Sequence, residues 1–121
     1  MRLATAAIIC LAMPAGSALA QDCEAPGTQA EMNACAGIAY EEADAALNAA
    51  YAEVRARLDE AGREQLVATQ RAWIAFRDAD CAAVGAGWMG GTGMGAAVSN
   101  CLADATRART KVLQSRTREG G

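Results

Sequence analysis

Residues 70–81, QRAWIAFRDADC, decide the fold that this sequence predicts. The stretch holds one of the two tryptophans, the only phenylalanine and a cysteine. At helical spacing Trp73, Arg77 and Cys81 fall on one face, four residues apart. That face combines a large apolar side chain, a charge and a sulfur that can form a crosslink. It predicts the inner face of a helix in a small disulfide-bonded helical domain.

A longer helical pattern precedes this stretch. Six residues repeat at intervals of four and three, which is the spacing of one helix face: Tyr40, Asp44, Leu47, Tyr51, Val54 and Leu58. Thr28 with Glu31 three residues later has the form of a capping box, so the helix should start there. Ala61–Gly62 should end it, because glycine is a common C-terminal cap. A second helix should run from about residue 63 to residue 83 as the antiparallel neighbour of the first.

A glycine-rich loop and a third helix should complete the domain. Six of the eleven residues from Gly85 to Gly95 are glycine. The helical pattern that follows turns four residues inward: Val98, Leu102, Ala105 and Val112. The sequence therefore predicts an all-α fold, a small disulfide-linked antiparallel three-helix domain made of a long helical hairpin and a third helix. Four side chains should form its core seam: Tyr40, Leu47, Tyr51 and Trp73.

The N-terminus predicts export. Arg2 precedes a short apolar run and a small-residue end at Ala18-Leu19-Ala20, which is typical of a cleaved signal peptide over residues 1–20. An amphipathic or buried N-terminal helix is the alternative, and the apolar run is too short to span a bilayer. The domain should then occupy residues 21–114, with a frayed tail at 115–121. No cysteine directly follows the small-residue end, so we expect a periplasmic or secreted protein without a membrane anchor.

Four cysteines remain after removal of the signal peptide, and in a short exported chain they imply two disulfides with three possible pairings. Reach along the predicted helices favours Cys23 with Cys35 and Cys81 with Cys101. Zinc binding and redox activity are the alternatives. Both are disfavoured, because the sequence has no histidine and no C-x-x-C pair. We expect no metal and no cofactor.

Charge patterning suggests a partner class and one buried pair. The net charge of −3 becomes −4 without Arg2, and such an acidic domain is a poor candidate for binding nucleic acid. It suits a basic protein partner, although a solvated acidic helix face is the simpler interpretation. Asp44 and Arg77 both interrupt apolar stripes, so we expect them to form a structural ion pair between the first two helices. A catalytic role for Asp44 would need a second carboxylate, a nucleophile or a metal.

The glycine loop allows two interpretations. It contains no basic residue and follows a helix, which disfavours a phosphate-binding loop. Trp88 could pack into the core. Alternatively, Trp88, Met89 and Met94 could form an exposed apolar contact surface, held in place by a disulfide between residues 81 and 101.

Several spaced motifs resemble one family. They are TQAEMNACA at 28–36, Tyr40, Ala43-Asp44, Leu47-Asn48, Tyr51, QRAWI at 70–74, FRD at 76–78, Cys81, Gly90-Gly91, Cys101-Leu102, Thr106 and Arg109. In this order they resemble the LprI-like lysozyme-inhibitor N-terminal domain of bacterial envelope proteins. The resemblance implies a secreted, disulfide-bonded helical domain that inhibits lysozyme, a basic hydrolase that attacks peptidoglycan.

Together these observations predict a protein-binding domain rather than an enzyme, with lysozyme as the leading partner and steric occlusion as the mechanism. The candidate contacts are three acidic residues of the first helix and two apolar residues of the loop: Glu41, Glu42, Glu53, Trp88 and Met89. The alternative is a structural or stress-related envelope module that binds peptidoglycan, a small ligand or another envelope protein. The sequence leaves the oligomeric state open.

Overall fold

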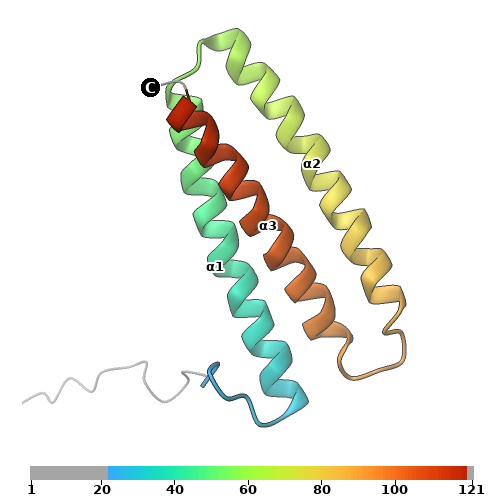
Figure 1. Ribbon diagram of the computed structural model, residues 1–121. Helices are drawn as coiled ribbons and strands as arrows, with labels where there is room; N and C mark the ends of the chain where they lie inside the picture. Colours follow the sequence, from blue (N-terminus) through green and yellow to red (C-terminus); the bar gives the residue numbers. More distant parts are fainter. Residues whose placement is uncertain (1–21, 120–121) are drawn as a thin grey trace, which may run out of the picture.

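The structure, a computed structural model, describes residues 22–119, so the predicted signal peptide lies outside the described residues. These residues form three α-helices and no strand: α1 (Gln29–Ala56), α2 (Glu60–Ala86) and α3 (Met94–Glu119) (Figure 1). The all-α, three-helix class is thus confirmed. The chain runs along α1, back along α2 and forward again along α3, so α1 and α3 are parallel and α2 is antiparallel to both.

Side-chain caps set the helix starts. The N–H of Glu31 donates to Thr28 Oγ1 at 3.1 Å, as the capping-box pattern predicted, while the Glu31 carboxylate accepts from the N–H of Gly27 at 2.7 Å. The predicted boundary at Gly62 was wrong. Asp59 caps α2 by accepting from the N–H of Gly62 at 2.8 Å, so the turn lies at residues 57–59.

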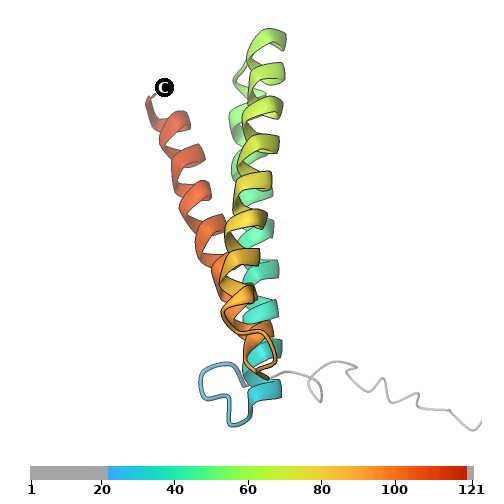
Figure 2. The same ribbon diagram turned by 90° about the vertical axis from the view of Figure 1, so that its right-hand side faces the viewer.

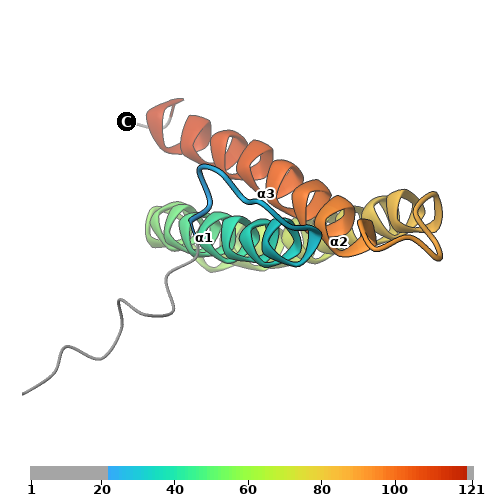
Figure 3. The ribbon, with the colours of Figure 1, turned by 90° about the horizontal axis from the view of Figure 1, so that it is seen from below.

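The third helix lies between the other two, so α1 and α2 form the expected antiparallel hairpin but are held together mainly through α3. α1 and α2 make few contacts with each other, and both pack mainly on α3. Figure 2 and Figure 3 show α3 crossing the pair obliquely and leaning away from it towards the C-terminus. α3 is also longer than expected and stays helical to Glu119, past the predicted start of the frayed tail at Ser115.

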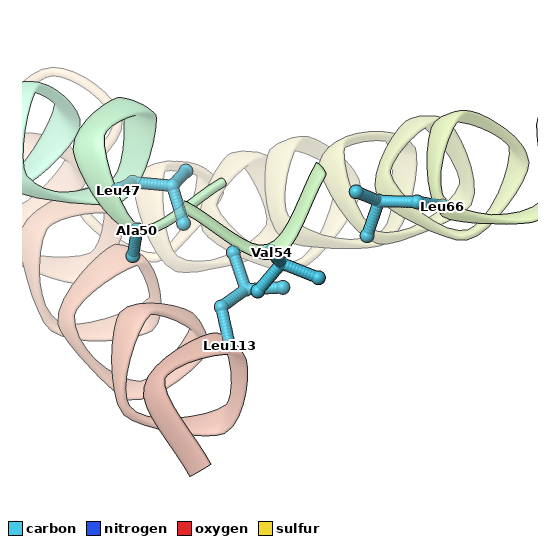
Figure 4. Close-up of a cluster of buried hydrophobic side chains, with 5 residues drawn as sticks. All are labelled: Leu47, Ala50, Val54, Leu66 and Leu113. Carbon is cyan, nitrogen blue, oxygen red and sulfur yellow. The ribbon is translucent and has the colours of Figure 1, made fainter. Parts of the chain in front are cut away.

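The apolar core is small and lies where the three helices meet. Its buried members are Leu47, Ala50, Val54, Leu66 and Leu113 (Figure 4). Of the predicted core seam, Leu47 is buried, whereas Tyr51 and Trp73 are partly buried and pack against this cluster. The predicted inner face of α3 was wrong by about one residue. Val112 is 44% exposed, and the buried residues are Ala103, Thr106, Thr110 and Leu113.

Small residues let the helices approach each other closely. Ala36, Ala43 and Ala50 recur every seven residues on the buried face of α1, which makes the densest contacts with α3. On α2, a Cβ added to Gly85 would lie 2.8 Å from Cγ2 of Val98 on α3. At both helix pairs, therefore, close packing depends on small residues, the alanines of α1 and Gly85 of α2.

Two glycine substitutions test this fit. Gly85→Ala is expected to lower the free energy of unfolding by about 1–2 kcal/mol, because the clash with Val98 outweighs the helix-propensity gain. Gly37→Ala is the matched control in α1, where a Cβ meets nothing within 4 Å. It should raise stability by about 0.5–1 kcal/mol. Urea unfolding followed by circular dichroism measures both. Equal effects of the two substitutions would contradict the proposed close contact.

Candidate functional site

The loop of residues 87–93, which joins α2 to α3, is clamped to α1 by one side chain. Asn33 Nδ2 donates to the carbonyl of Thr92 at 3.0 Å, and Asn33 Oδ1 accepts from the N–H of Ala96 at 2.9 Å. Gln29 Nε2 also donates to Asn33 Oδ1 at 2.9 Å, which orients the amide. The first turn of α3 therefore receives its cap from a different helix. This amide holds three segments of the chain together.

A disulfide holds the other side of the loop. Cys81, 1% exposed on α2, is bonded to Cys101 on α3, and the close approach of Gly85 to Val98 lies one turn further along. Cys23 is bonded to Cys35 and ties the segment before α1 to that helix. Both bonds join the cysteines that the sequence favoured. The loop therefore lies on a covalently tied frame.

The loop presents its two large apolar residues to solvent. Trp88 is 53% exposed and Met89 is 76% exposed. One edge of the Trp88 ring lies against Gly93, where an added Cβ would be 3.1 Å from Cζ3. Within the loop, the N–H of Gly91 donates to the Trp88 carbonyl at 2.9 Å, and Gly90 has a φ of +83°, which favours glycine. Trp88 is therefore exposed and does not pack into the core.

The predicted ion pair between Asp44 and Arg77 does not form, which is a correction to the sequence analysis. Arg77 Nη2 lies 2.9 Å from Oδ1 of Asp78, and Arg77 Nη1 donates to Thr106 Oγ1 at 3.3 Å. Asp44 accepts only a long 3.5 Å contact from Asn48 among the hydrogen bonds that residues 22–119 form. The physical reason is that Asp78, the next residue in the sequence, and Thr106 on α3 already accept hydrogen bonds from the guanidinium of Arg77.

Arg77 is instead the centre of a stacked polar cluster inside the bundle. Only 7% of it is exposed, and its guanidinium carbon lies 5.5 Å from the ring centroid of Tyr40 and 5.1 Å from that of Trp73. The guanidinium carbon of Arg109 also lies close to Trp73, 5.8 Å from its ring centroid. Arg109 Nε donates to Gln70 Oε1 at 3.0 Å. Burial lowers the pKa of the Arg109 guanidinium, and the positive charge of Arg116 lowers it further. The cluster joins all three helices and has a structural role.

Charge is segregated along the bundle. We call residues 22–44 and 77–104, which include the loop, the acidic half of the bundle. Residues 45–76 and 105–119 are the basic half. The acidic half carries one basic residue, the buried Arg77, against these acids: Asp22, Glu24, Glu31, Glu41, Glu42, Asp44, Asp78, Asp80 and Asp104. The acids of the basic half are Glu53, Asp59, Glu60, Glu64 and Glu119. Its bases are Arg55, Arg57, Arg63, Arg71, Arg107, Arg109, Lys111, Arg116 and Arg118.

The predicted contact residues divide between the two halves. Glu41, Glu42 and Glu53 are all exposed on α1. Glu41 and Glu42 belong to the acidic half together with Trp88 and Met89, whereas Glu53 lies about 16 Å further along the helix, in the basic half. The fold therefore brings four of the five candidates to the same half of the bundle.

Sequence reasoning missed the residues that position this surface. Asn33 was noticed only as part of the TQAEMNACA motif, and its contact with the loop spans 59 residues of sequence, beyond any local signal. Within the described part of the chain, no group of three or more histidine, cysteine, aspartate or glutamate residues is arranged to hold a metal ion. Nor does any helix over residues 22–119 combine the length and the apolar character needed to cross a bilayer.

These features define a small disulfide-bonded helical domain with an apolar loop fixed at an acidic end, a form suited to binding another protein. The family model described as "Lysozyme inhibitor LprI" matches residues 20–113. The chain therefore belongs to the LprI lysozyme inhibitor family, an inhibitor family rather than an enzyme family. It is also similar to an uncharacterized protein of Rhizobium meliloti (strain 1021); the two are 34% identical in an alignment that covers 88% of this chain and 87% of the relative. No solved structure matches the chain.

Proposed function

We propose that this protein is an exported inhibitor that binds a lysozyme through its loop and the surrounding acidic half. Membership of the LprI family supports the choice of partner. The observation that carries the proposal is the position of Trp88 and Met89, which are solvent-exposed on a loop held by a disulfide and by Asn33. Inhibition would be steric, with the loop covering the substrate cleft of the enzyme.

A clamped apolar loop suits this role for energetic reasons. Large side chains that become fully desolvated dominate the binding energy of protein interfaces, and tryptophan is among the commonest of them. A loop that is already fixed loses little conformational entropy when it binds. The disulfide between Cys81 and Cys101 and the Asn33 clamp supply that order before the partner arrives.

The acidic half would contribute to the rate of association. Eight of its nine acids are exposed, and its only base is buried. Such a surface attracts a cationic protein over several ångströms, and this attraction weakens as salt screens the charges. Glu41 and Glu42 would act in this way beside the loop. Glu53, which the sequence also suggested as a contact, lies among basic residues and should contribute less.

Export follows from the same proposal. The LprI family and the two disulfides fit an oxidising compartment outside the cytoplasm, either the periplasm or the medium. The signal peptide proposed for residues 1–20 would deliver the chain there. Cleavage after Ala20 would leave Cys23 near the new N-terminus, where the Cys23–Cys35 bond retains it.

The test is inhibition of a purified cationic lysozyme acting on isolated cell walls at low salt. The wild-type protein at micromolar excess should slow turnover. The double variant Trp88→Ala, Met89→Ser should raise the inhibition constant by about a hundredfold, because it removes the apolar anchor. Ile74→Ser is the matched control, since Ile74 is 38% exposed but lies outside the loop, and it should change inhibition by less than about threefold.

Charge variants separate steering from anchoring. Glu41→Gln with Glu42→Gln should slow association and reduce its salt dependence, with a smaller effect on dissociation. Glu53→Gln is the control on the same helix. Unchanged cell-wall turnover with wild-type protein would show the proposal to be wrong. Binding to isolated cell wall without any effect on lysozyme would instead support a structural module of the envelope.

A further inference from the structure

A second apolar surface lies away from the loop, on one side of α2 and α3. A groove of about 290 Å³ runs between the two helices there. Phe76 borders the groove and is 69% exposed, and Val112 on the opposite wall is 44% exposed. Two alanines, Ala105 and Ala108, form part of the wall and leave room beside Phe76. A large exposed aromatic ring thus lies next to a groove with small lining residues.

We propose that this face binds a second copy of the chain, forming an antiparallel dimer about a twofold axis beside Phe76. A twofold interface must be self-complementary, because each copy presents the same patch to the other. Here the protruding ring and the receiving groove are adjacent on one surface. A rotation of 180° would bring the two Phe76 rings together over the groove between α2 and α3 of each copy.

The charge distribution favours the antiparallel arrangement. Phe76 lies at the boundary between the acidic half and the basic half. An axis perpendicular to the helices at this level would place the acidic half of each copy beside the basic half of the other. The acidic half has a formal net charge of −8, nine acids against one base, and the basic half +4, nine bases against five acids. Parallel association would instead bring like charges together, which is unfavourable.

One pair of charged residues matches this axis closely. Arg77 and Thr106 are hydrogen-bonded across α2 and α3, which sets a common level. Asp80 follows Arg77 by three residues and Arg109 follows Thr106 by three. Because the helices are antiparallel, the two residues lie about 4.5 Å on either side of that level. The twofold rotation therefore brings Asp80 to the level of Arg109 in the second copy.

Both members of this pair lack a complete set of partners within one chain. Asp80 and Arg109 both line the groove, but neither belongs to the two ion pairs that residues 22–119 form. Arg109 Nη2 is shielded from water and has no hydrogen-bond partner in this part of the chain. Arg109 Nη1 is not shielded and makes no hydrogen bond within residues 22–119, so a carboxylate from a second copy would supply a counter-charge to the guanidinium at this nitrogen.

The dimer would leave the loops free. Antiparallel packing about Phe76 places the two Trp88 loops at opposite ends of the assembly. The inference therefore stands independently of lysozyme binding, and each can fail without the other.

Sedimentation equilibrium of the mature protein between about 1 µM and 1 mM tests the proposal. We expect a reversible dimer. Phe76→Ser should raise the dissociation constant by roughly a hundredfold or more, because each dimer buries two phenylalanine rings. Helix content and melting temperature should change little, since the ring is exposed in the monomer. Ile74→Ser is the control, because Ile74 lies two residues away on nearly the opposite side of α2.

Crosslinking gives a second readout of the axis. Phe76→Cys should form an intermolecular disulfide under mild oxidation, because the two copies of residue 76 meet beside the axis, whereas Ile74→Cys should not. Asp80→Asn should weaken the dimer by about tenfold at low salt. A wild-type protein that remains monomeric up to 1 mM would overturn the proposal. A dimer that survives Phe76→Ser unchanged would overturn this choice of surface.

Discussion

Replacement of Arg77 by alanine is expected to lower the free energy of unfolding by about 3 kcal/mol or more. The guanidinium is buried between Tyr40 and Trp73 and donates to Thr106, so its removal leaves a cavity at the junction of three helices. For a domain of this size, that is a large share of the total stability. Urea unfolding monitored by tryptophan fluorescence and by circular dichroism measures the change.

The variant Arg77→Met separates the contribution of the side chain's volume to stability from that of its charge. Methionine fills much of the same space, and the former partner Asp78 is exposed, so no buried charge is left unpaired. We expect a loss of only about 1 kcal/mol. Equal losses for the alanine and methionine variants would show that the cation itself, rather than the filled volume, stabilises the bundle. A negligible loss for alanine would contradict the assigned structural role.

Removal of the disulfide between α2 and α3 is expected to have a comparable effect. The double variant Cys81→Ala, Cys101→Ala should lose about 3–4 kcal/mol, because the bond restricts the unfolded chain and Cys81 is also fully packed. The same variant should weaken lysozyme inhibition, since the loop loses its frame. Thermal and urea unfolding measure the first effect, and the cell-wall assay measures the second.

The other disulfide provides the control. Cys23 is exposed, and its bond to Cys35 holds only the short segment before α1. Without this bond the segment gains freedom in the folded state as well as in the unfolded state, so Cys23→Ala with Cys35→Ala should cost about 1 kcal/mol or less. If both disulfides contributed equally, the α2–α3 frame would have no special importance for stability.

Much of the fold could be predicted because its signals are local. The spacing of Leu47 and Val54, the cap at Thr28 and the cysteine spacings each depend on neighbouring residues. The sequence did not indicate which helices pack most closely. The short turn expected at Ala61–Gly62 suggested that α1 and α2 pack together, but the alanines of α1 pack on α3 instead. That competition depends on three-dimensional shape, and periodicity does not reveal it.

The candidate surface was predictable in its chemistry but not in its construction. The loop composition indicated that Trp88 and Met89 could be exposed, and the charge imbalance along the chain suggested an acidic region. The clamp by Asn33 joins residues far apart in sequence, and so does the contact between Arg77 and Thr106. Asp44 was the expected partner of Arg77 because the sequence did not reveal that Thr106 on α3 would contact the guanidinium.

The order of the two disulfides along the chain has a consequence for proteolysis. The Cys23–Cys35 bond lies within the segment that ends in the first half of α1, and the Cys81–Cys101 bond joins α2 to α3. Within residues 22–119, therefore, neither bond links the two sides of the turn at residues 57–59. A single backbone cut in that turn would leave α1 attached by non-covalent contacts alone. The nicked protein would hold together in native buffer, yet it would separate into two fragments in denaturant without any reducing agent.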